Sequence, residues 1–301
     1  MAHEPNHRPA DHSRAFAIGV ALNIGFVVIE AVFGVIAGSL ALLADAGHNL
    51  GDVLGLLLAW GASNLSQQRP TQRHTYGWRS SSILAALLNA VILLVAVGAI
   101  AWEAIRRLTE PSEVAGLTVI VVAFVGVVIN TATALLFMAG RKSDLNIRGA
   151  FLHMAADAGV SVGVVVAGVA ILATGWQWVD PVVSLLIAIV ILFSTSELLR
   201  DSVNLALNAV PEHIDPKAVE AYLKSLPGVT NIHDLHIWGM STTSAAMTAH
   251  LVKPDPRDDD ALITQASKEL HERFGIEHTT LQWERGDSTQ PCDVACEKGS
   301  V

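Results

Sequence analysis

The sequence predicts an α-helical membrane protein with six transmembrane helices, followed by a small α+β domain. Hydrophobic residues make up 51% of the 301 residues, whereas charged residues make up only 16%. The apolar residues gather in runs of about 20, which is the length that spans a bilayer as a helix. After about residue 210 these runs give way to shorter helical and alternating patterns, which indicates a separate folded domain.

Six apolar segments follow one another along the first two hundred residues. They cover about residues 15–37, 40–65, 83–105, 117–139, 147–174 and 179–199. The second and fifth segments are the least purely apolar. We therefore expect four parts: an N-terminal tail (1–14), a six-helix transmembrane domain (15–209), an α+β domain (210–286) and a C-terminal tail (287–301).

Positive charges predict how the chain is oriented in the membrane. Lys and Arg residues precede the first segment and follow the second, fourth and sixth, namely Arg8, Arg14, Arg69, Arg73, Arg79, Arg141, Lys142, Arg148 and Arg200. Short loops rich in these residues stay on the cytoplasmic side. Both termini are thus predicted to be cytoplasmic. Compact loops and the lack of a recognisable targeting signal favour a bacterial inner membrane.

The C-terminal part shows an α-β-β-α-β order. Its expected helices cover about residues 215–226 and 258–274, and its expected strands cover about 229–240, 245–253 and 278–285. This order predicts one sheet backed by two helices. From Asp201 onward there are 8 Lys and Arg against 16 Asp and Glu, so eight of the nine net negative charges lie there. Such an acidic domain argues against a nucleic-acid partner and suits cations.

A repeated motif carries the functional prediction. His48 and Asp52 in the second segment, and His153 and Asp157 in the fifth, have the same His-x-x-x-Asp spacing. Residues four apart share one face of a helix. Two such helices facing each other offer two imidazoles and two carboxylates, a set suited to tetrahedral Zn²⁺. A single copy more often marks a helix-end histidine or a hydrogen-bonded core aspartate, but two copies within apolar spans favour a metal site.

Two further acidic residues lie within the apolar runs. Glu30 has two interpretations, as part of a cation or proton path or as a buried, protonated structural group. Asp45 lies on the same helical face as His48 and Asp52, so it either orients His48 from behind or begins a helix at the membrane surface.

The combination of motifs resembles one known family. The two His-x-x-x-Asp motifs, the loop from His74 to Arg79 (HTYGWR) and the stretch from His233 to Trp238 (HDLHIW) are similar to those of the cation diffusion facilitators, and the zinc-type members match best. The resemblance spans residues 15–285. It implies a homodimeric transporter that moves a divalent metal out of the cytoplasm in exchange for protons. It also implies that the C-terminal domain has a metallochaperone-like fold.

The resemblance assigns roles to individual residues. The transport ligands match His48, Asp52, His153 and Asp157. Cytoplasmic ligands match His233, His250 and Glu284, so Zn²⁺ is expected as cargo and also as a bound ion of that domain. Cys292 and Cys296 resemble a C-terminal cysteine pair of some relatives, with Cys-x-x-x-Cys in place of Cys-x-x-Cys. In the family's loop site only His74 is retained.

Two other classes of function compete with transport. A membrane metalloenzyme usually leaves a zinc position open, whereas four ligands close this site, and no His-Glu-x-x-His is present. We therefore expect no enzymatic activity. A membrane-anchored metal sensor that binds without transporting is the alternative, although sensing needs no ligands inside the membrane. Zn²⁺ is the expected cargo, with Cd²⁺ and Co²⁺ as related ions whose order of preference the sequence leaves open.

Overall fold

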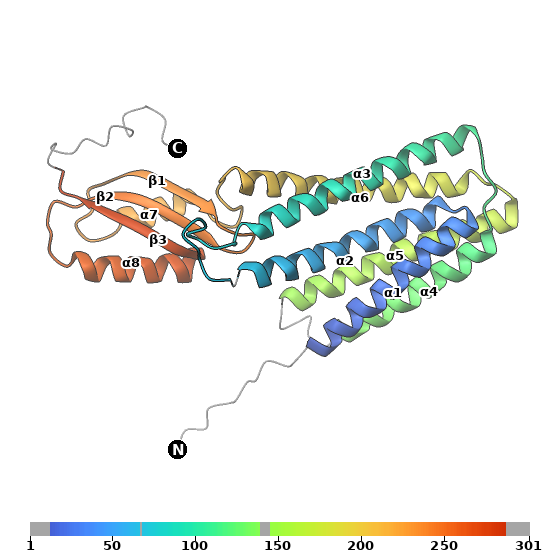
Figure 1. Ribbon diagram of the computed structural model, residues 1–301, viewed down its shortest axis with the longest axis horizontal. Helices are drawn as coiled ribbons and strands as arrows, with labels where there is room; N and C mark the ends of the chain where they lie inside the picture. Colours follow the sequence, from blue (N-terminus) through green and yellow to red (C-terminus); the bar gives the residue numbers. More distant parts are fainter. Residues whose placement is uncertain (1–12, 67, 139–144, 287–301) are drawn as a thin grey trace, which may run out of the picture. The chain divides into compact units, whose positions relative to one another are not determined.

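The computed structural model describes residues 13–66, 68–138 and 145–286. It divides into two compact units, one built from residues 1–57 and 89–197, and the other from residues 58–88 and 198–301. Six long helices come first: α1 (Ser13–Ala37), α2 (Leu40–Ser66), α3 (Ser81–Thr109), α4 (Gly116–Met138), α5 (Leu145–Thr174) and α6 (Val179–Ala206) (Figure 1). Each coincides with one predicted apolar segment, although α6 continues seven residues beyond the predicted end at residue 199.

Helix composition confirms a helical transmembrane domain. Among the described residues, four helical stretches are long and apolar enough to cross a membrane, namely Ser81–Thr109, Gly116–Leu136, Phe151–Thr174 and Val179–Ala206. In α1 a shorter apolar stretch runs from Ala21 to Ala37. In α2 the polar side chains of the predicted site interrupt the run of apolar residues, while the helix itself is continuous. The total of six spans therefore stays a prediction.

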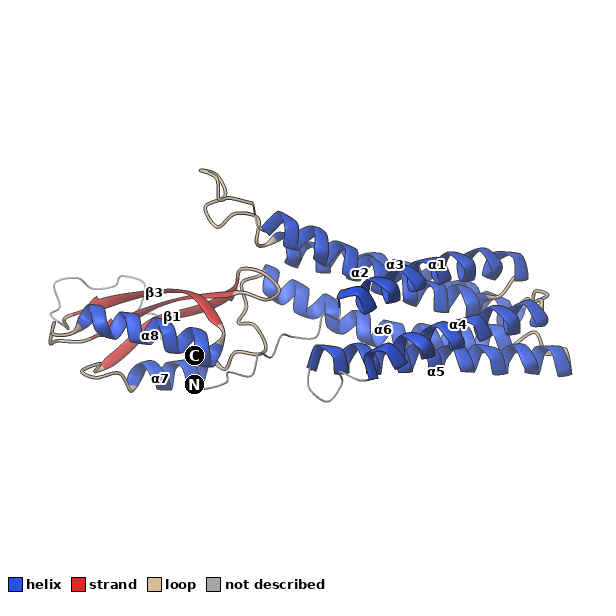
Figure 2. Cartoon of the chain, turned by 90° about the horizontal axis from the view of Figure 1, so that it is seen from below, coloured by secondary structure: helices blue, strands red, loops and turns tan. Residues whose placement is uncertain are grey.

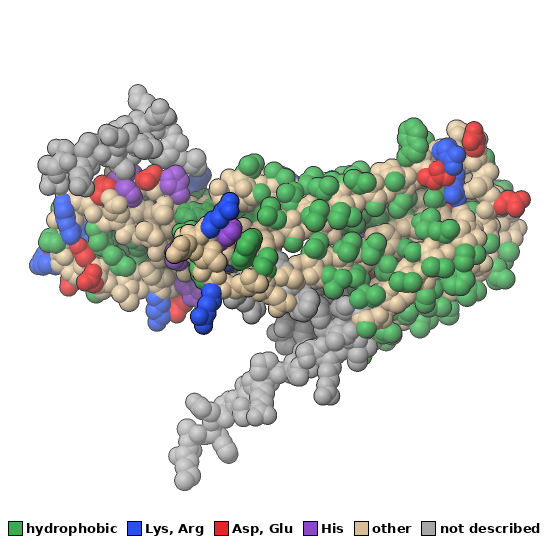
Figure 3. Space-filling view, viewed as in Figure 1, with side chains coloured by type: hydrophobic (Ala, Val, Ile, Leu, Met, Phe, Trp, Pro, Cys, Tyr) green, Lys and Arg blue, Asp and Glu red, His purple; other side chains and the backbone are tan. Residues whose placement is uncertain are grey.

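The outer surface of the helices is that of a protein surrounded by lipid. Large apolar side chains point outward along several helices, as in Val35, Trp102 and Phe193, which are 71%, 74% and 74% exposed. Hydrophobic side chains cover this part of the chain in the space-filling view (Figure 3). An apolar outside with buried polar groups is the arrangement expected in a bilayer, where polar side chains face the bundle interior.

The start of α2 is held by a residue from the start of α6. Ser39 precedes α2, and its hydroxyl accepts from the backbone N–H of Leu42 at 3.2 Å, as an N-cap does. Asp180 accepts from the Ser39 hydroxyl at 2.5 Å and from the N–H groups of Leu40 and Ala41 at 2.7 and 3.2 Å. These bonds satisfy N–H groups that a helix leaves unpaired at its first turn. Asp180 thereby fixes the position of α2.

Helices α1, α4 and α5 pack side by side in the first unit (Figure 1). The approach of α4 to α5 depends on glycine, because a Cβ on Gly168 would meet Ile120 at 2.8 Å and the Gly116 carbonyl oxygen at 3.2 Å. Small residues permit such close contact between membrane helices. The close packing sets the position of α5, which carries the second His-x-x-x-Asp motif.

The second unit contains the predicted α-β-β-α-β domain. Its elements are α7 (Pro216–Lys224), β1 (Asn231–Gly239), β2 (Ala245–Val252), α8 (Asp259–Phe274) and β3 (Ile276–Glu284). The strand order is β1-β2-β3, with β1 antiparallel and β3 parallel to β2. Both helices pack on one face of this sheet (Figure 2). The predicted sheet backed by two helices is confirmed.

Details of this domain differ slightly from expectation. Strand β3 begins at Ile276, two residues before the predicted start, because Ile276 is buried in the core and pairs with Ala245. Helix α8 begins after Asp258, which adopts a left-handed conformation (φ 62°) and makes no side-chain cap. The register of β1 shifts between His233 and His236, and Asp234 there has φ 54°. This is a bulge, which redirects side chains of the strand.

The loop between α2 and α3 contacts the sheet within the second unit. Ser80 donates to the carbonyl of Met240 at 3.2 Å, and the N–H of Thr242 donates to the Ser82 hydroxyl at 3.1 Å. Both partners lie at the β1–β2 turn. Arg79 pairs with Glu277 of β3 at 3.7 Å. The loop that follows the motif-bearing helix α2 is thus attached to the C-terminal sheet.

Candidate metal centres

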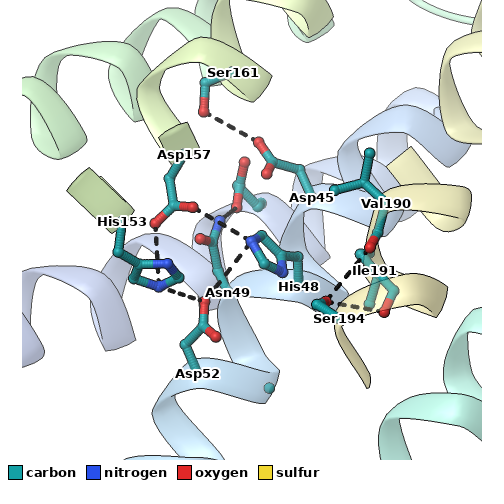
Figure 4. A network of polar contacts seen from close by, with 12 residues as sticks. Asp45, His48, Asn49, Asp52, His153, Asp157, Ser161, Val190, Ile191 and Ser194 are labelled. Carbon is teal, nitrogen blue, oxygen red and sulfur yellow. Dashed lines mark hydrogen bonds and ion pairs between the residues drawn. The ribbon is translucent and has the colours of Figure 1, made fainter. Parts of the chain in front are cut away.

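The two His-x-x-x-Asp motifs meet between α2 and α5. His48 and Asp52 project from α2, and His153 and Asp157 project toward them from α5 (Figure 4). Within each helix, the spacing of four residues aligns the two side chains on one face. The four predicted transport ligands are therefore brought together, and we call this group the helix centre.

Donor atoms in the helix centre form a ring in which histidine and aspartate alternate. The nitrogen–oxygen separations are 3.3 Å for His48–Asp157, 3.6 Å for Asp157–His153, 3.1 Å for His153–Asp52 and 3.9 Å for Asp52–His48. Zn–N and Zn–O bonds of about 2.0–2.1 Å place neighbouring ligand atoms of a tetrahedral site about 3.3 Å apart. The ring thus has nearly the ligand spacing that tetrahedral zinc requires.

The two histidines lie opposite each other in the ring. Their ring centroids lie 6.0 Å apart. His48, Asp52 and Asp157 offer donor atoms within 4.8 Å of one another, and His153 lies outside that compact set. A modest movement of the His153 side chain toward His48 would complete a tetrahedron.

Burial varies around the helix centre. Asp157 is buried, with 1% of its side chain exposed, and His48 is 20% exposed, whereas Asp52 and His153 are 30% and 42% exposed. A carboxylate at the buried edge must be compensated by a cation or a proton, because an isolated buried charge is costly. Asp52 and His153 thus lie at the more exposed edge of the helix centre.

A second layer of polar residues lies behind the helix centre. Asp45 accepts from Ser161 of α5 at 3.1 Å, and Asn49 donates to Glu30 of α1 at 3.0 Å. The hydrogen bond of Asp45 goes to Ser161, and the interpretation that Asp45 orients His48 stays a prediction. The interpretation that it begins a helix is wrong, because α2 begins at Leu40.

His74 lies apart from these groups. Its ring stacks on Trp78 at a centroid distance of 4.2 Å, and its Nδ1 lies 3.5 Å from the Thr71 hydroxyl. Neither group of potential metal ligands found among the described residues includes it. Through this stacking on Trp78, His74 contributes to the packing of the loop.

A second cluster forms on the C-terminal sheet, where β1, β2 and β3 bring His233, His250 and Glu284 together. His233 pairs with His250 across the antiparallel ladder, and their rings lie 5.2 Å apart. Glu284 reaches both, with its oxygens 2.9 Å from His233 Nε2 and 2.8 Å from His250 Nδ1. Their donor atoms lie within 4.8 Å of one another. We call this group the sheet centre.

Electrostatics at the sheet centre favour an ionised carboxylate. Partial burial raises the pKa of Glu284, but hydrogen bonds from His233 and His250 lower it more, so its pKa lies below the ordinary value. An ionised carboxylate between two imidazoles is the form that a metal ion needs.

Comparison with known proteins assigns the chain to a family. The cation efflux transmembrane domain family matches residues 16–205, and the cytoplasmic domain family of cation efflux proteins matches residues 211–286. The chain belongs to the cation efflux family. The resemblance to zinc-type cation diffusion facilitators is thereby confirmed, and the chain is an integral membrane protein with a cytoplasmic domain.

Relatives of this cation efflux protein match over nearly their whole length. The zinc transporter ZitB of Escherichia coli (strain K12) is 38% identical over 294 residues, which cover 97% of this chain and 92% of that protein. The cadmium, cobalt and zinc/H(+)-K(+) antiporter of Bacillus subtilis (strain 168) is 33% identical over 297 residues, covering 97% and 95%.

A solved structure is also similar to part of this chain. It is the metal-bound C-terminal domain of the CzcD transporter from Cupriavidus metallidurans. It is 33% identical and covers 24% of this chain and 99% of that chain, with a TM-score of 0.22.

Sequence reasoning missed some residues of the cation efflux protein that lie in or near the two centres. Asp234 lies 3.7 Å from His250 and 2.9 Å from His236, so the sheet centre has a further carboxylate beside it. A regular strand would turn Asp234 to the opposite face from His233, but the bulge prevents that alternation. Asn49 and Ser161 also went unnoticed, although they lie one and four residues from predicted ligands. Cys292 and Cys296 lie outside the described residues.

Proposed function

We propose that this cation efflux protein binds Zn²⁺ at the helix centre and exports it from the cytoplasm in exchange for protons. The single observation behind this is the closed ring of His48, Asp157, His153 and Asp52 between two helices of a transmembrane domain. Two imidazole nitrogens and two carboxylates suit zinc, and they suit cadmium and cobalt as further cargo. Relatives named as transporters of zinc, cadmium and cobalt support the same assignment.

Exchange with protons follows from the chemistry of the ligands. Metal binds neutral imidazole and ionised carboxylate, so protons compete with it for the same atoms. An unperturbed histidine titrates near pH 6.5, which lies close to the pH of a cytoplasm. When the ion leaves toward the far side, His48 and His153 take up protons, and those protons are released when the next ion binds from the cytoplasm.

Alternating exposure of the site needs movement between its two halves. The ligands come in two pairs, one pair on α2 and the other on α5, so relative movement of these helices changes both the access and the geometry of the site. The protein works as a homodimer in a bacterial inner membrane, with both termini in the cytoplasm. A sensor that only binds metal would have no use for ligands between transmembrane helices.

The sheet centre is proposed as a resident zinc site. His233, His250 and Glu284 supply a His₂Glu donor set, which occurs in zinc proteins. A bound Zn²⁺ would also neutralise part of the acidic charge of the domain where two copies meet. The Cys292 and Cys296 thiols are proposed as additional ligands.

Zinc flux in proteoliposomes tests the transport proposal. Asp157→Ala removes one of four ligands and should reduce Zn²⁺ flux to the level of empty vesicles. Asp201→Ala, at a carboxylate on α6 outside the helix centre, is the matched control and should transport normally. Wild-type flux in Asp157→Ala would refute the assignment of the site. Zinc binding without any flux in the wild-type protein would favour the alternative function, a membrane-anchored metal sensor.

A further inference from the structure

The polar layer behind the helix centre is completely buried. Glu30, Asp45, Asn49 and Ser161 have no exposed surface. They come from three helices, α1, α2 and α5. One oxygen of each carboxyl group has a donor, since Asn49 donates to Glu30 Oε2. Ser161 donates to Asp45 Oδ2 (Figure 4). Such a layer needs full pairing, because polar atoms inside a membrane protein are costly when unpaired.

The other oxygen of each carboxyl group lacks a donor. Glu30 Oε1 and Asp45 Oδ1 are buried, and no donor among the described residues bonds to either. The two side chains nevertheless lie within hydrogen-bonding reach of each other. Two ionised carboxylates both accept and neither donates, so they cannot form a hydrogen bond. One proton placed between them supplies the missing donor and removes one of two repelling charges.

Among the described residues, no Lys or Arg acts on the pair in place of this proton. The ionisable groups that act on the pair are His48 of α2 and Asp157 of α5. Helix α4, which packs on α1, carries no ionisable residue between Gly116 and Met138. Asp157 adds negative charge, which favours protonation of the pair. The Nε2 atom of His48 lies 3.3 Å from Asp157 Oδ1, so this imidazole also interacts with Asp157.

We propose that Glu30 and Asp45 form a binding site for the exchanged proton, next to the metal ligands but separate from them. This inference rests on the proposed function. When Zn²⁺ enters the helix centre, its positive charge disfavours the shared proton. The O–H bond of the carboxyl pair breaks, the proton passes to water as H₃O⁺, and both carboxylates are left ionised. When the metal leaves, a proton from water returns to the pair.

Reciprocity makes this arrangement useful for antiport. If bound metal expels the proton, then the bound proton weakens metal binding by the same factor. The proton therefore helps to release metal on the far side of the membrane, where the pair is refilled. A larger monovalent cation such as K⁺ would have to push the two carboxyl groups apart, so the hydrogen-bonding distance favours a proton.

Proton counting on the full-length protein tests the site. Purified protein in weak buffer is titrated with Cd²⁺, and bound metal and released protons are both measured. We expect Glu30→Gln, Asp45→Asn and the double variant each to release about one proton fewer per metal than the wild type. The double variant should lose no more than either single variant, because one proton is shared. Glu197→Gln, at an exposed carboxyl group on α6, is the control and should match the wild type.

Infrared spectroscopy gives a second measurement, whose main signal comes from the wild-type protein and therefore does not depend on whether a variant folds. The carbonyl band of a protonated carboxylic acid should disappear when Cd²⁺ binds, and Asp45→Asn should lack that change. An unchanged proton count in both single variants, with metal still bound, would overturn the proposal. So would a twofold loss in the double variant, or release of K⁺ in place of the missing proton. Equal Cd²⁺ binding by Asp157→Ala and the wild type would instead refute the transport site itself.

Discussion

The helix centre and the sheet centre use the same side chains on two different supports. In the helix centre, one histidine and one aspartate come from each of two helices, so the site exists only while α2 and α5 keep one relative position. In the sheet centre, backbone ladders fix His233 opposite His250 and place Glu284 on the next strand. A pair of helices can slide, whereas hydrogen-bonded strands cannot. The first support suits an ion that must leave, and the second suits an ion that stays.

The largest predicted effect is on transport, which should depend on the helix centre and not on the sheet centre. Asp52→Ala should reduce Zn²⁺ flux at least about a hundredfold, because loss of a direct ligand exceeds the 10–100-fold cost of changing an outer partner. His233→Ala combined with His250→Ala should keep flux at saturating zinc. Vesicle flux measured over a range of zinc concentrations checks both. Equal losses in the two variants would remove the distinction between a moving and a resident site.

A smaller effect is predicted for selectivity. His48→Asp replaces imidazole with a carboxylate, which suits harder ions such as Mn²⁺. The ratio of Zn²⁺ to Mn²⁺ transport should fall on the order of tenfold, which corresponds to about 1.4 kcal/mol. Competition between the two ions in the same vesicles measures this ratio. His250→Asp at the sheet centre is the matched variant and should leave the ratio unchanged.

The support of the helix centre should be sensitive to the start of α2. Asp180→Ala leaves the N–H groups of Leu40 and Ala41 buried without an acceptor. Loss of a helix cap costs about 0.5–2 kcal/mol, and each unpaired buried group costs about 1–3 kcal/mol. Thermal unfolding of the detergent-solubilised protein should occur at a lower temperature. Asp201→Ala serves as control, and an unchanged melting temperature in Asp180→Ala would show that α2 is held by other contacts.

The smallest effect concerns the support of the sheet centre. Hydrogen bonds from Arg285 and Lys253 lower the pKa of Asp259. A carboxyl group with a lowered pKa stabilises the fold above its unfolded pKa of about 3.9, and that contribution is lost as the pH falls through the lower, folded pKa. Asp259→Asn should therefore weaken the cytoplasmic domain at neutral pH and flatten its loss of stability in acid. Denaturant midpoints from pH 7 to pH 3 measure this, with Asp260→Asn as control.

Local spacing explains which parts of the two centres could be predicted. The interval of four residues identifies His48 with Asp52, and His153 with Asp157, because helix geometry depends only on neighbouring residues. Alternation along strands likewise placed His233 and His250 on neighbouring strands of one sheet.

Contacts between distant residues were beyond such reasoning. Asp180 caps a helix that begins 140 residues earlier, and Asn49 meets Glu30 from a different helix. The bulge at Asp234 has no periodic signal, since it interrupts the alternation from which a strand is predicted. These features depend on how helices pack and how strands pair, which a pattern along one segment does not determine.

The number of zinc ions bound per chain tests most directly whether the helix centre holds the cargo. His233→Ala with His250→Ala removes the sheet centre, so this background should bind about one Zn²⁺ per chain, with two imidazoles visible in its X-ray absorption spectrum. Adding Asp157→Ala should abolish that remaining ion and its imidazole signal. Retention of one ion per chain with the same spectrum after Asp157→Ala would contradict the proposed site.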